Sequence, residues 1–338
     1  MKLKLLDCTL RDGGYINDWR FGEKQIREIA NSLTNTNVDI IELGFLKNEP
    51  YQKDRAVFHD VSQLTPLIPH ERGGRLYAAM AEVMNPIPVE MIAPHDGASI
   101  DMIRVIVWKR LLKEGFAYCK GIVEKGYKLC VQPARTEQYS LEEYAQLIWM
   151  YNSIHPYAVY VVDSWGSMCD SQIMQYLEVA HENLSPGIAL GYHGHNNLMQ
   201  VFGAAQSFIE RGFDREIILD ASIYGIGRGA GNLNIEVIAN HLNMIYGTHY
   251  NIAPMISIYQ NYLKEIRGTT SWGYNFAYFL TAVSHCNPEY ARYYTEKGVD
   301  ELTIAHIIHS LSDEDKIIFT REKAEMYFAR LACKDGEK

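Results

Sequence analysis

Two short segments of this 338-residue chain combine residue types that could do chemistry together. The first covers residues 10–14 (LRDGG), where the carboxylate of Asp12 stands beside the guanidinium of Arg11 on a glycine-rich turn. Such a pair could provide a metal ligand next to a fixed positive donor, or it could be an ordinary ion pair at the surface. The second segment, residues 193–197 (HGHNN), follows an apolar run. His193 and His195 are two residues apart, so on a strand both imidazoles project to the same face. Convergent imidazoles favour a metal site over two unrelated polar side chains.

A glycine-rich loop occupies residues 225–232 (GIGRGAGN), directly before a helical pattern. Loops of this kind let backbone N–H groups approach an anion at the start of a helix, so we expect Gly227 and Gly229 to contact substrate. The spacing also resembles a dinucleotide fingerprint. That motif requires a further strand carrying an acidic residue about 20 positions later, and the strand pattern has ended here. A nicotinamide site is therefore disfavoured.

Two carboxylates, Glu42 and Asp163, end apolar strand patterns. A buried carboxylate is costly unless it is paired, hydrogen-bonded or bound to a metal. Singly, each is best explained as a helix cap or a partner in an ion pair. Together with the segments above they stand at the ends of several different strands, which indicates one polar cluster with Glu42 and Asp163 as substrate-binding candidates.

The elements that would position these residues alternate along the chain. Short runs rich in Val, Ile and Leu recur roughly every 25 to 37 residues, the size of a βα unit, with helical patterns between them, and residues 140–143 (SLEE) form a capping box. Eight such units predict a (β/α)₈ TIM barrel, and a doubly wound sheet is the main alternative. The eight runs are residues 3–8, 38–45, 75–81, 102–108, 128–132, 158–162, 188–192 and 217–219.

The strand pattern stops near Gly247. Residues 248–338 show helical spacing and aromatic clusters but no convincing strand. We therefore expect a catalytic barrel over residues 1–247 and a helical C-terminal extension over residues 248–338, docked on the barrel or on a partner.

Composition excludes several functional classes. The chain has 32 Lys and Arg against 41 Asp and Glu, a formal net charge of −9. An acidic surface argues against nucleic-acid binding. No uncharged apolar stretch is long enough to span a membrane, and no signal peptide is expected. The six cysteines are far apart and indicate reduced thiols in a cytoplasmic protein rather than a disulfide framework.

These motifs resemble a known superfamily. Residues 6–13 (LDCTLRDG) are similar to the D-x-T-L-R-D-G opening of the metal-dependent lyase and synthase barrels, which include 3-hydroxy-3-methylglutaryl-CoA lyase and 4-hydroxy-2-oxovalerate aldolase. Residues 193–197 resemble the H-x-H-N-[DN] element of that superfamily, and residues 225–232 resemble its glycine loop ending in asparagine. The three motifs occur in the same order as in the superfamily.

The resemblance implies a ligand set and a chemistry. It implies that Asp12, His193 and His195 hold a divalent metal, with Asn232 in or near the coordination shell. It also implies that Arg11 stabilises an enolate oxygen. We expect Mn²⁺ or Mg²⁺, with Zn²⁺ and Co²⁺ as alternatives. Such an ion can chelate a 2-oxo acid through its keto and carboxylate oxygens.

Departures from the superfamily pattern narrow the branch. The acyl-CoA-using members have glutamine two places after the R-D-G glycine, where this chain has Tyr15, and the lyase branch has a cysteine where this chain has Ile223. The 4-hydroxy-2-oxovalerate aldolase branch places a histidine base at the position of Tyr15. Residues 272–280 (WGYNFAYFL) resemble the tyrosine-bearing helical segment of that branch. Tyr15, Tyr274 and Tyr278 are therefore the catalytic candidates for proton transfer.

The leading hypothesis is a metal-dependent aldolase. It would interconvert pyruvate plus an aldehyde and a 4-hydroxy-2-oxo acid through a metal-bound enolate. A Claisen-type synthase joining an acyl-CoA to a 2-oxo acid is the alternative enzyme, and a non-catalytic metabolite-binding barrel is the alternative of another class. The expected partners are a 2-oxo acid and an aldehyde. A second copy of the chain, or a partner enzyme docked through the extension, is also expected.

Overall fold

The computed structural model describes residues 2–270 and 272–335, with side chains up to residue 330. Its centre is a closed barrel of parallel strands, each paired with its neighbour, and β1 pairs with both β9 and β2 to close the ring. The two-residue strand β3 (Val57–Phe58) adds to β2. This closure confirms the TIM barrel and removes the doubly wound sheet. The barrel strands are β1 (Leu3–Asp7), β2 (Ile40–Leu46), β4 (Leu76–Glu82), β5 (Met102–Val107), β6 (Lys128–Pro133), β7 (Ala158–Asp163), β8 (Ala189–Gly194) and β9 (Ile217–Ala221).

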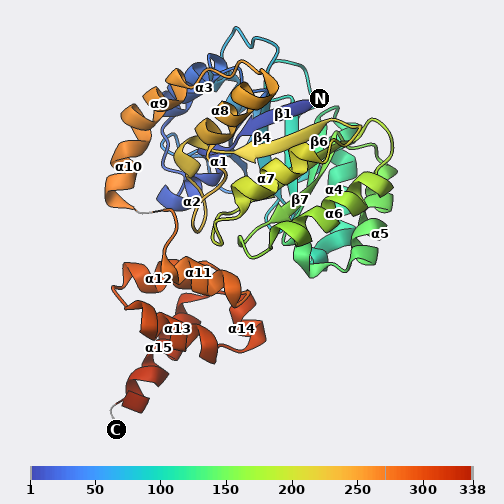
Figure 1. Ribbon diagram of the computed structural model, residues 1–338. Helices are drawn as coiled ribbons and strands as arrows, with labels where there is room; N and C mark the ends of the chain where they lie inside the picture. Colours follow the sequence, from blue (N-terminus) through green and yellow to red (C-terminus); the bar gives the residue numbers. More distant parts are fainter. Residues whose placement is uncertain (1, 271, 336–338) are drawn as a thin grey trace.

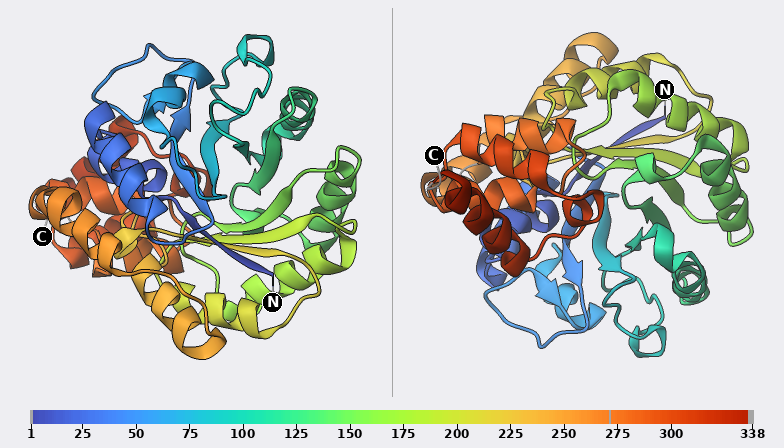
Figure 2. Two further views of the ribbon diagram at one scale, coloured as in Figure 1. Left: turned by 90° about the horizontal axis from the view of Figure 1, so that it is seen from above. Right: turned by 90° about the horizontal axis from the view of Figure 1, so that it is seen from below.

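Helices surround the barrel and bury the outer faces of its strands, as seen from above in Figure 2. Because both faces are covered, the strands are continuously apolar, which is why the apolar runs predicted them well. The predicted capping box is present: Ser140 Oγ accepts the backbone N–H of Glu143, and the Glu143 carboxylate accepts that of Ser140. The surrounding helices are α3 (Glu23–Thr34), α4 (Leu112–Glu124), α5 (Leu141–Asn152), α6 (Asp170–Asn183), α7 (Val201–Glu210) and α8 (Ile235–Tyr246), and the 3₁₀ helix η1 (Val61–Leu67) follows β3.

Short helical segments follow several strands at the carboxyl end of the barrel. They are α1 (Thr9–Asp12), α2 (Gly14–Asn17), η2 (Val89–Met91), η3 (Lys109–Leu111), η4 (Thr136–Gln138) and η5 (Ile223–Gly225). The first of these carries the LRDGG motif, so Arg11 and Asp12 are held on one helical turn directly after β1.

The part of the chain after α8 is helical, as expected, but it packs as two groups. The first group packs against the barrel, because Met255, Ile258 and Leu263 belong to the barrel's hydrophobic core. The second group has its own core around Tyr290, Tyr294 and Ile307 and lies below the barrel in Figure 1. The domain boundary at residue 247 stays a prediction, since the change of core comes later in the chain. The first group is α9 (Ala253–Ile258), the π-helix η6 (Tyr259–Leu263) and α10 (Lys264–Thr269), and the second is α11 (Phe276–Val283), α12 (Glu289–Glu296), α13 (Glu301–Ser310), α14 (Asp313–Ile317) and α15 (Arg321–Asp335).

We call α11–α15 the helical module. It touches the carboxyl end of the barrel, where Nη1 of Arg292 donates to the backbone oxygen of Tyr15 at 2.7 Å. Seen from below, the module lies over one side of the barrel (Figure 2). The module therefore stands beside the face on which active sites of this architecture form.

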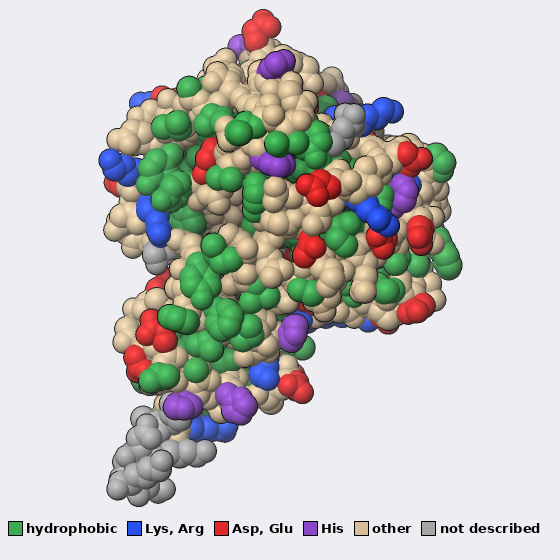
Figure 3. All heavy atoms as spheres, in the orientation of Figure 1, with side chains coloured by type: hydrophobic (Ala, Val, Ile, Leu, Met, Phe, Trp, Pro, Cys, Tyr) green, Lys and Arg blue, Asp and Glu red, His purple; other side chains and the backbone are tan. Residues whose placement is uncertain are grey.

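Hydrophobic side chains also gather on the surface of the helical module (Figure 3). Phe276, Val283 and Leu302 are among its exposed apolar side chains. Apolar patches of this kind are typical of protein interfaces, although docking of a second copy or a partner enzyme stays a prediction. Within residues 2–270 and 272–335, no helix is both long and apolar enough to cross a bilayer.

A buried carboxylate at the end of β1 gives a pH-dependent prediction. Burial raises the pKa of Asp7 to about 7, against the hydrogen bonds from Thr9 that lower it. Between the unfolded value near 4 and this folded value, the native protein holds a proton that the unfolded chain has lost. The Asp7 contribution to the free energy of unfolding therefore decreases as pH rises from about 4 to about 7, and it is constant outside that window.

Asp7→Asn should flatten this slope, because the amide is neutral at every pH. Urea unfolding between pH 4.5 and 7.5 measures the effect, with substitution of the exposed Asp54 by Asn as the control. An unchanged slope in Asp7→Asn would contradict the assignment of the titration to Asp7.

Candidate active site

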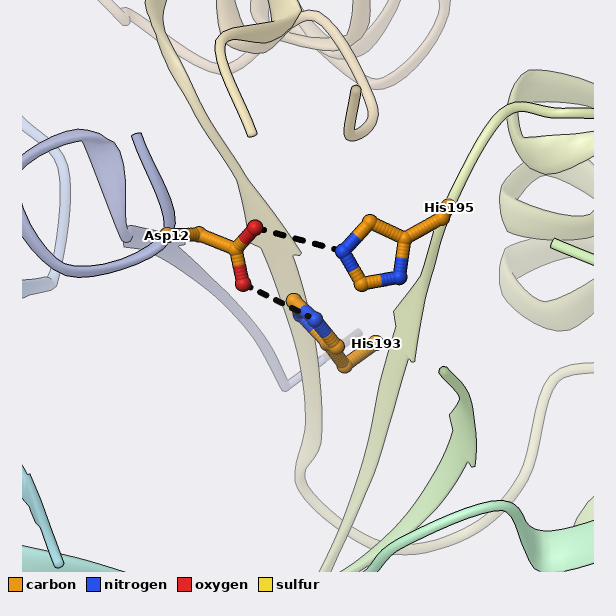
Figure 4. A group of neighbouring side chains, drawn as sticks. All are labelled: Asp12, His193 and His195. Atoms are coloured by element: carbon orange, nitrogen blue, oxygen red, sulfur yellow. Dashed lines mark hydrogen bonds and ion pairs between the residues drawn. The ribbon is translucent and has the colours of Figure 1, made fainter. Parts of the chain in front are cut away.

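Asp12, His193 and His195 come together at the carboxyl end of the barrel (Figure 4). One ligand atom from each lies within 4.8 Å of the others, and all three side chains are buried. Oδ1 of Asp12 is 3.2 Å from Nε2 of His195, and Oδ2 is 3.4 Å from Nε2 of His193. The carboxylate that follows β1 and the two imidazoles at the end of β8 therefore face one point.

Neighbouring groups orient both imidazoles. Nδ1 of His193 lies 3.0 Å from Oδ2 of Asp220, at the end of β9. Nδ1 of His195 lies 3.2 Å from the backbone oxygen of Asp163, at the end of β7. Acceptors at Nδ1 favour the tautomer that leaves Nε2 free, and metal-binding histidines usually have such partners.

Asn232 completes the group. Its Nδ2 donates to the backbone oxygen of Ile226 at 3.0 Å, whereas its Oδ1 is buried without a hydrogen-bond partner. Residues 195 and 232 also pair as an isolated antiparallel bridge, which places Asn232 beside His195. An orphaned buried oxygen is expensive, so its presence here fits a fourth ligand. Among the described residues, this donor set of oxygens and imidazole nitrogens suits a divalent cation.

Arg11 is held beside this group by buried carboxylates. Its Nε donates to Oε2 of Glu42 at 2.7 Å, and its Nη1 contacts the carboxylate of Asp12. Nη2 of Arg11 is buried without a partner. The guanidinium thus has one nitrogen, Nη2, that is available to donate a hydrogen bond to an oxyanion.

A second buried guanidinium supports both sides of the site. Arg104, in β5, contacts Oε2 of Glu42 at 2.9 Å and also the carboxylate of Asp220. It therefore connects the carboxylate that orients Arg11 with the one that orients His193. Removing one member of such a network leaves a buried charge without its partner, which is strongly destabilising.

The charges of the site shift the pKa of each ligand. Burial acts to raise the pKa of Asp12, but Arg11 and the imidazoles outweigh it and hold that pKa well below its usual range. For His193, burial acts to lower the pKa, yet Asp12 and Asp220 raise it overall. For His195, burial dominates and lowers the pKa. Asp12 is therefore a carboxylate ready for a cation.

Asp12, His193 and His195 line a cavity whose empty volume is about 530 Å³, part of it open to solvent. The cavity walls come from the carboxyl ends of the strands, as expected for this architecture. The lining residues are Arg11, Asp12, Tyr15, Met80, Glu82, Ile106, Trp108, Gln132, Ala134, Val162, Ser164, His193, His195 and Arg228.

The predicted substrate-binding carboxylates lie behind this cavity rather than in its wall. Glu42 is the counter-ion of Arg11 and Arg104. Asp163 accepts the backbone N–H groups of Ser167 and Met168, and burial raises its pKa to about 7. Each is committed to neighbouring protein groups, because full burial requires a partner. Their placement is that of positioning residues.

The predicted glycines act through close packing. A Cβ on Gly227 would come within 2.6 Å of Oδ1 of Asp12 and would also clash with Asn232. Gly229 has φ +64°, and a Cβ there would meet Oδ1 of Asn197 at 2.7 Å. Neither glycine lines the cavity among the described residues. The loop needs them so that its backbone can approach the ligand group.

Of the three predicted tyrosines, the structure brings one to the cavity. Tyr15 lines the wall, and burial raises its pKa well above the ordinary value even though Arg228 acts to lower it. Tyr274 is 49% exposed and Tyr278 packs in the core of the helical module, so neither reaches this cavity. Tyr278 instead lines a separate cavity between the helical module and α2, together with Ile16 and Arg292.

Sequence reasoning missed three charged residues of the site. Asp220 and Arg104 had a visible signal, since each is a charged residue inside or at the end of an apolar strand pattern, like Glu42. Arg228 belongs to the glycine loop, but nothing in the motif indicates that its side chain lines the cavity.

The molecule is a closed βα barrel with a buried group of one carboxylate and two imidazoles, suited to a divalent cation, at its carboxyl end. Comparison with known proteins relates it to carbon–carbon lyases. Residues 108–260 match the HMGL-like family model, so this segment of the chain is an HMGL-like domain.

Relatives and solved structures point the same way. The chain is 24% identical over 242 residues to an oxaloacetate decarboxylase from Mycobacterium tuberculosis, covering 69% of this chain and 68% of the relative. It is 26% identical to a 4-hydroxy-2-oxovalerate aldolase from Pelotomaculum thermopropionicum, covering 70% and 69%. The N-terminal domain of a provisionally named aldolase from Bacteroides vulgatus has the same fold, with a TM-score of 0.72, 24% identity and coverage of 86% and 96%. The HMGL-like domain and these relatives support a carbon–carbon lyase.

Proposed function

We propose that this protein is a divalent-metal-dependent aldolase that interconverts pyruvate plus an aldehyde and a 4-hydroxy-2-oxo acid. The observation that carries the proposal is the buried group of Asp12, His193 and His195, with Arg11 beside it, in the wall of one cavity. Relatives named 4-hydroxy-2-oxovalerate aldolase support the same reaction class.

The residues of the cavity would have different roles in the reaction. A divalent cation held by Asp12, His193 and His195 would act as a Lewis acid on the keto oxygen of a 2-oxo acid. Arg11 would hold the developing enolate oxygen through Nη2, the fork atom without a partner. Trp108 and Val162 add apolar surface to the wall.

A second candidate is decarboxylation of a 2-oxo acid with a carboxylate at C4, which passes through the same pyruvate enolate. One observation favours it. Aldol cleavage needs a base for the C4 hydroxyl proton, whereas in the described cavity both imidazoles face Asp12 and burial keeps Tyr15 protonated. Loss of carbon dioxide needs no such base. The Mycobacterium tuberculosis relative named oxaloacetate decarboxylase supports this candidate.

Two measurements test the proposal. Exchange of the pyruvate methyl protons for deuterium reports enolate formation without an aldehyde, and pyruvate release from 4-hydroxy-2-oxo acids reports cleavage. Both should require Mn²⁺ or Mg²⁺ and should stop with a chelator. Pyruvate release from oxaloacetate without cleavage of any hydroxy acid would select the decarboxylase. Thioester-dependent turnover with thiol release would select the Claisen-type synthase, and absence of every activity from metal-loaded protein would contradict the proposal.

Tyr15→Phe separates the two halves of the aldolase reaction. We expect cleavage to slow by about 10²-fold, the low end for loss of one donor to a developing oxyanion, while exchange of the pyruvate methyl protons changes little. The reason is that the hydroxyl of Tyr15, which burial keeps protonated, would donate a hydrogen bond to the C4 oxygen but not to the enolate. An equal loss of both rates would mean that Tyr15 positions the pyruvate, and no loss of either would remove it from the mechanism.

A further inference from the structure

Arg228 connects the cavity with the helical module. Its backbone N–H donates to Oδ1 of Asp12 at 3.0 Å, so its backbone lies directly beside the candidate metal ligands. Its Nη2 donates to Oδ1 of Asn287 at 3.1 Å, and its Nε lies 3.4 Å from Oε1 of Glu289. The ring of Tyr15 lies 5.6 Å from its Cζ. Contacts from Tyr15 in α2, from Asn287 and from Glu289 in α12 therefore hold the guanidinium at the cavity wall.

The guanidinium of Arg228 has a weaker ion-pair partner than that of Arg11. Arg11 is enclosed by two fully buried carboxylates. The partner of Arg228 is Glu289, whose side chain is 28% exposed, and Nε of Arg228 is buried without a hydrogen-bond partner. Partly exposed ion pairs of this kind are weak. An incoming anion can therefore replace Glu289 at little cost.

We infer that Arg228 is the residue that selects an aldehyde bearing an anionic group, either a carboxylate or a phosphate. A planar guanidinium can bind either group with two parallel hydrogen bonds. This inference rests on the proposed function and names the substrate class of the same site. It also gives the helical module a part in specificity, since Asn287 and Glu289 fix the direction of Arg228.

Matched aldehyde pairs test the inference. Succinic semialdehyde is compared with its neutral methyl ester, and glyceraldehyde 3-phosphate with glyceraldehyde, each with pyruvate and Mg²⁺. The wild-type protein should prefer the anionic member of at least one pair by about tenfold or more, and the pair that shows the preference identifies carboxylate or phosphate as the recognised group. Arg228→Gln should lower kcat/KM for that anionic aldehyde by about 30-fold and for its neutral partner by less than about threefold.

The control is Arg110→Gln, which removes the same charge from an exposed arginine beside a neighbouring cavity at the barrel end. Exchange of the pyruvate methyl protons, which needs no aldehyde, should be unchanged in Arg110→Gln. An equal fall for charged and neutral aldehydes in Arg228→Gln would make Arg228 a structural link to α12 and overturn the inference. A wild-type protein without preference in either pair would also overturn it.

A binding measurement does not depend on turnover. Succinate and inorganic phosphate are titrated calorimetrically into the metal-free protein. We expect at least one of them to bind, and Arg228→Gln to weaken that binding about tenfold or more while Arg110→Gln does not. Absence of wild-type binding, or equal affinities in wild type and Arg228→Gln, would count against the inference. Failure of pyruvate exchange in the wild-type protein would instead contradict the proposed function, so the two failures are distinguishable.

Discussion

His195→Ala is expected to lose bound metal and all metal-dependent activity while the barrel stays folded. The imidazole supplies one of three converging ligand atoms, and its Nδ1 contact is to a backbone oxygen, so its removal leaves no buried carboxylate without a partner. Removal of residues that only support a ligand typically costs 10- to 100-fold in metal affinity. The loss of the ligand itself should exceed about 100-fold. Elemental analysis after dialysis and thermal unfolding by circular dichroism measure the two effects.

His309→Ala is the matched control, because this histidine is exposed on α13. His193→Ala should lose metal too, but with some loss of stability, since its Nδ1 lies against the buried carboxylate of Asp220. Full metal content in both His193→Ala and His195→Ala would refute the ligand assignment.

Arg11→Lys is expected to reduce turnover by about 10²- to 10³-fold, the scale for loss of one oxyanion donor. The guanidinium serves Glu42 through Nε and Asp12 through Nη1 and still has Nη2 for the substrate. A lysine ammonium keeps the positive charge, but it cannot bind Glu42, Asp12 and the substrate oxygen together in a fixed planar arrangement. Metal content should stay close to normal, because Arg11 is not a ligand.

Rates of pyruvate methyl exchange and of aldol cleavage should fall together in Arg11→Lys, because both pass through the enolate. This pattern differs from that of Tyr15→Phe, where cleavage alone should slow. Arg20→Lys, at an exposed position, is the control. Near-normal exchange in Arg11→Lys would remove Arg11 from enolate stabilisation.

The amino-acid sequence by itself determined the barrel and predicted that Asp12, His193 and His195 come together at one end of it. Parallel strands buried on both faces must be continuously apolar, so each of the eight apolar runs marks one strand. Strand alternation places His193 and His195 on one face, and the first βα turn places Asp12 at the same end of the barrel. These are local rules, and they hold wherever the strands close.

What only the tertiary structure decided is which side chains reach the cavity. Asp163 ends β7, whereas Glu42 lies inside β2 and not at its end as the sequence pattern predicted. Both lie behind the cavity wall because buried neighbouring groups pair with their carboxylates. Arg228 lines the cavity because Asn287 and Glu289, more than 50 positions later in the chain, contact its guanidinium and hold it there. Tyr274 and Tyr278 lie outside the cavity because the helical module packs around its own core rather than against the barrel interior. Such choices depend on contacts between distant segments, which residue spacing along the chain does not encode.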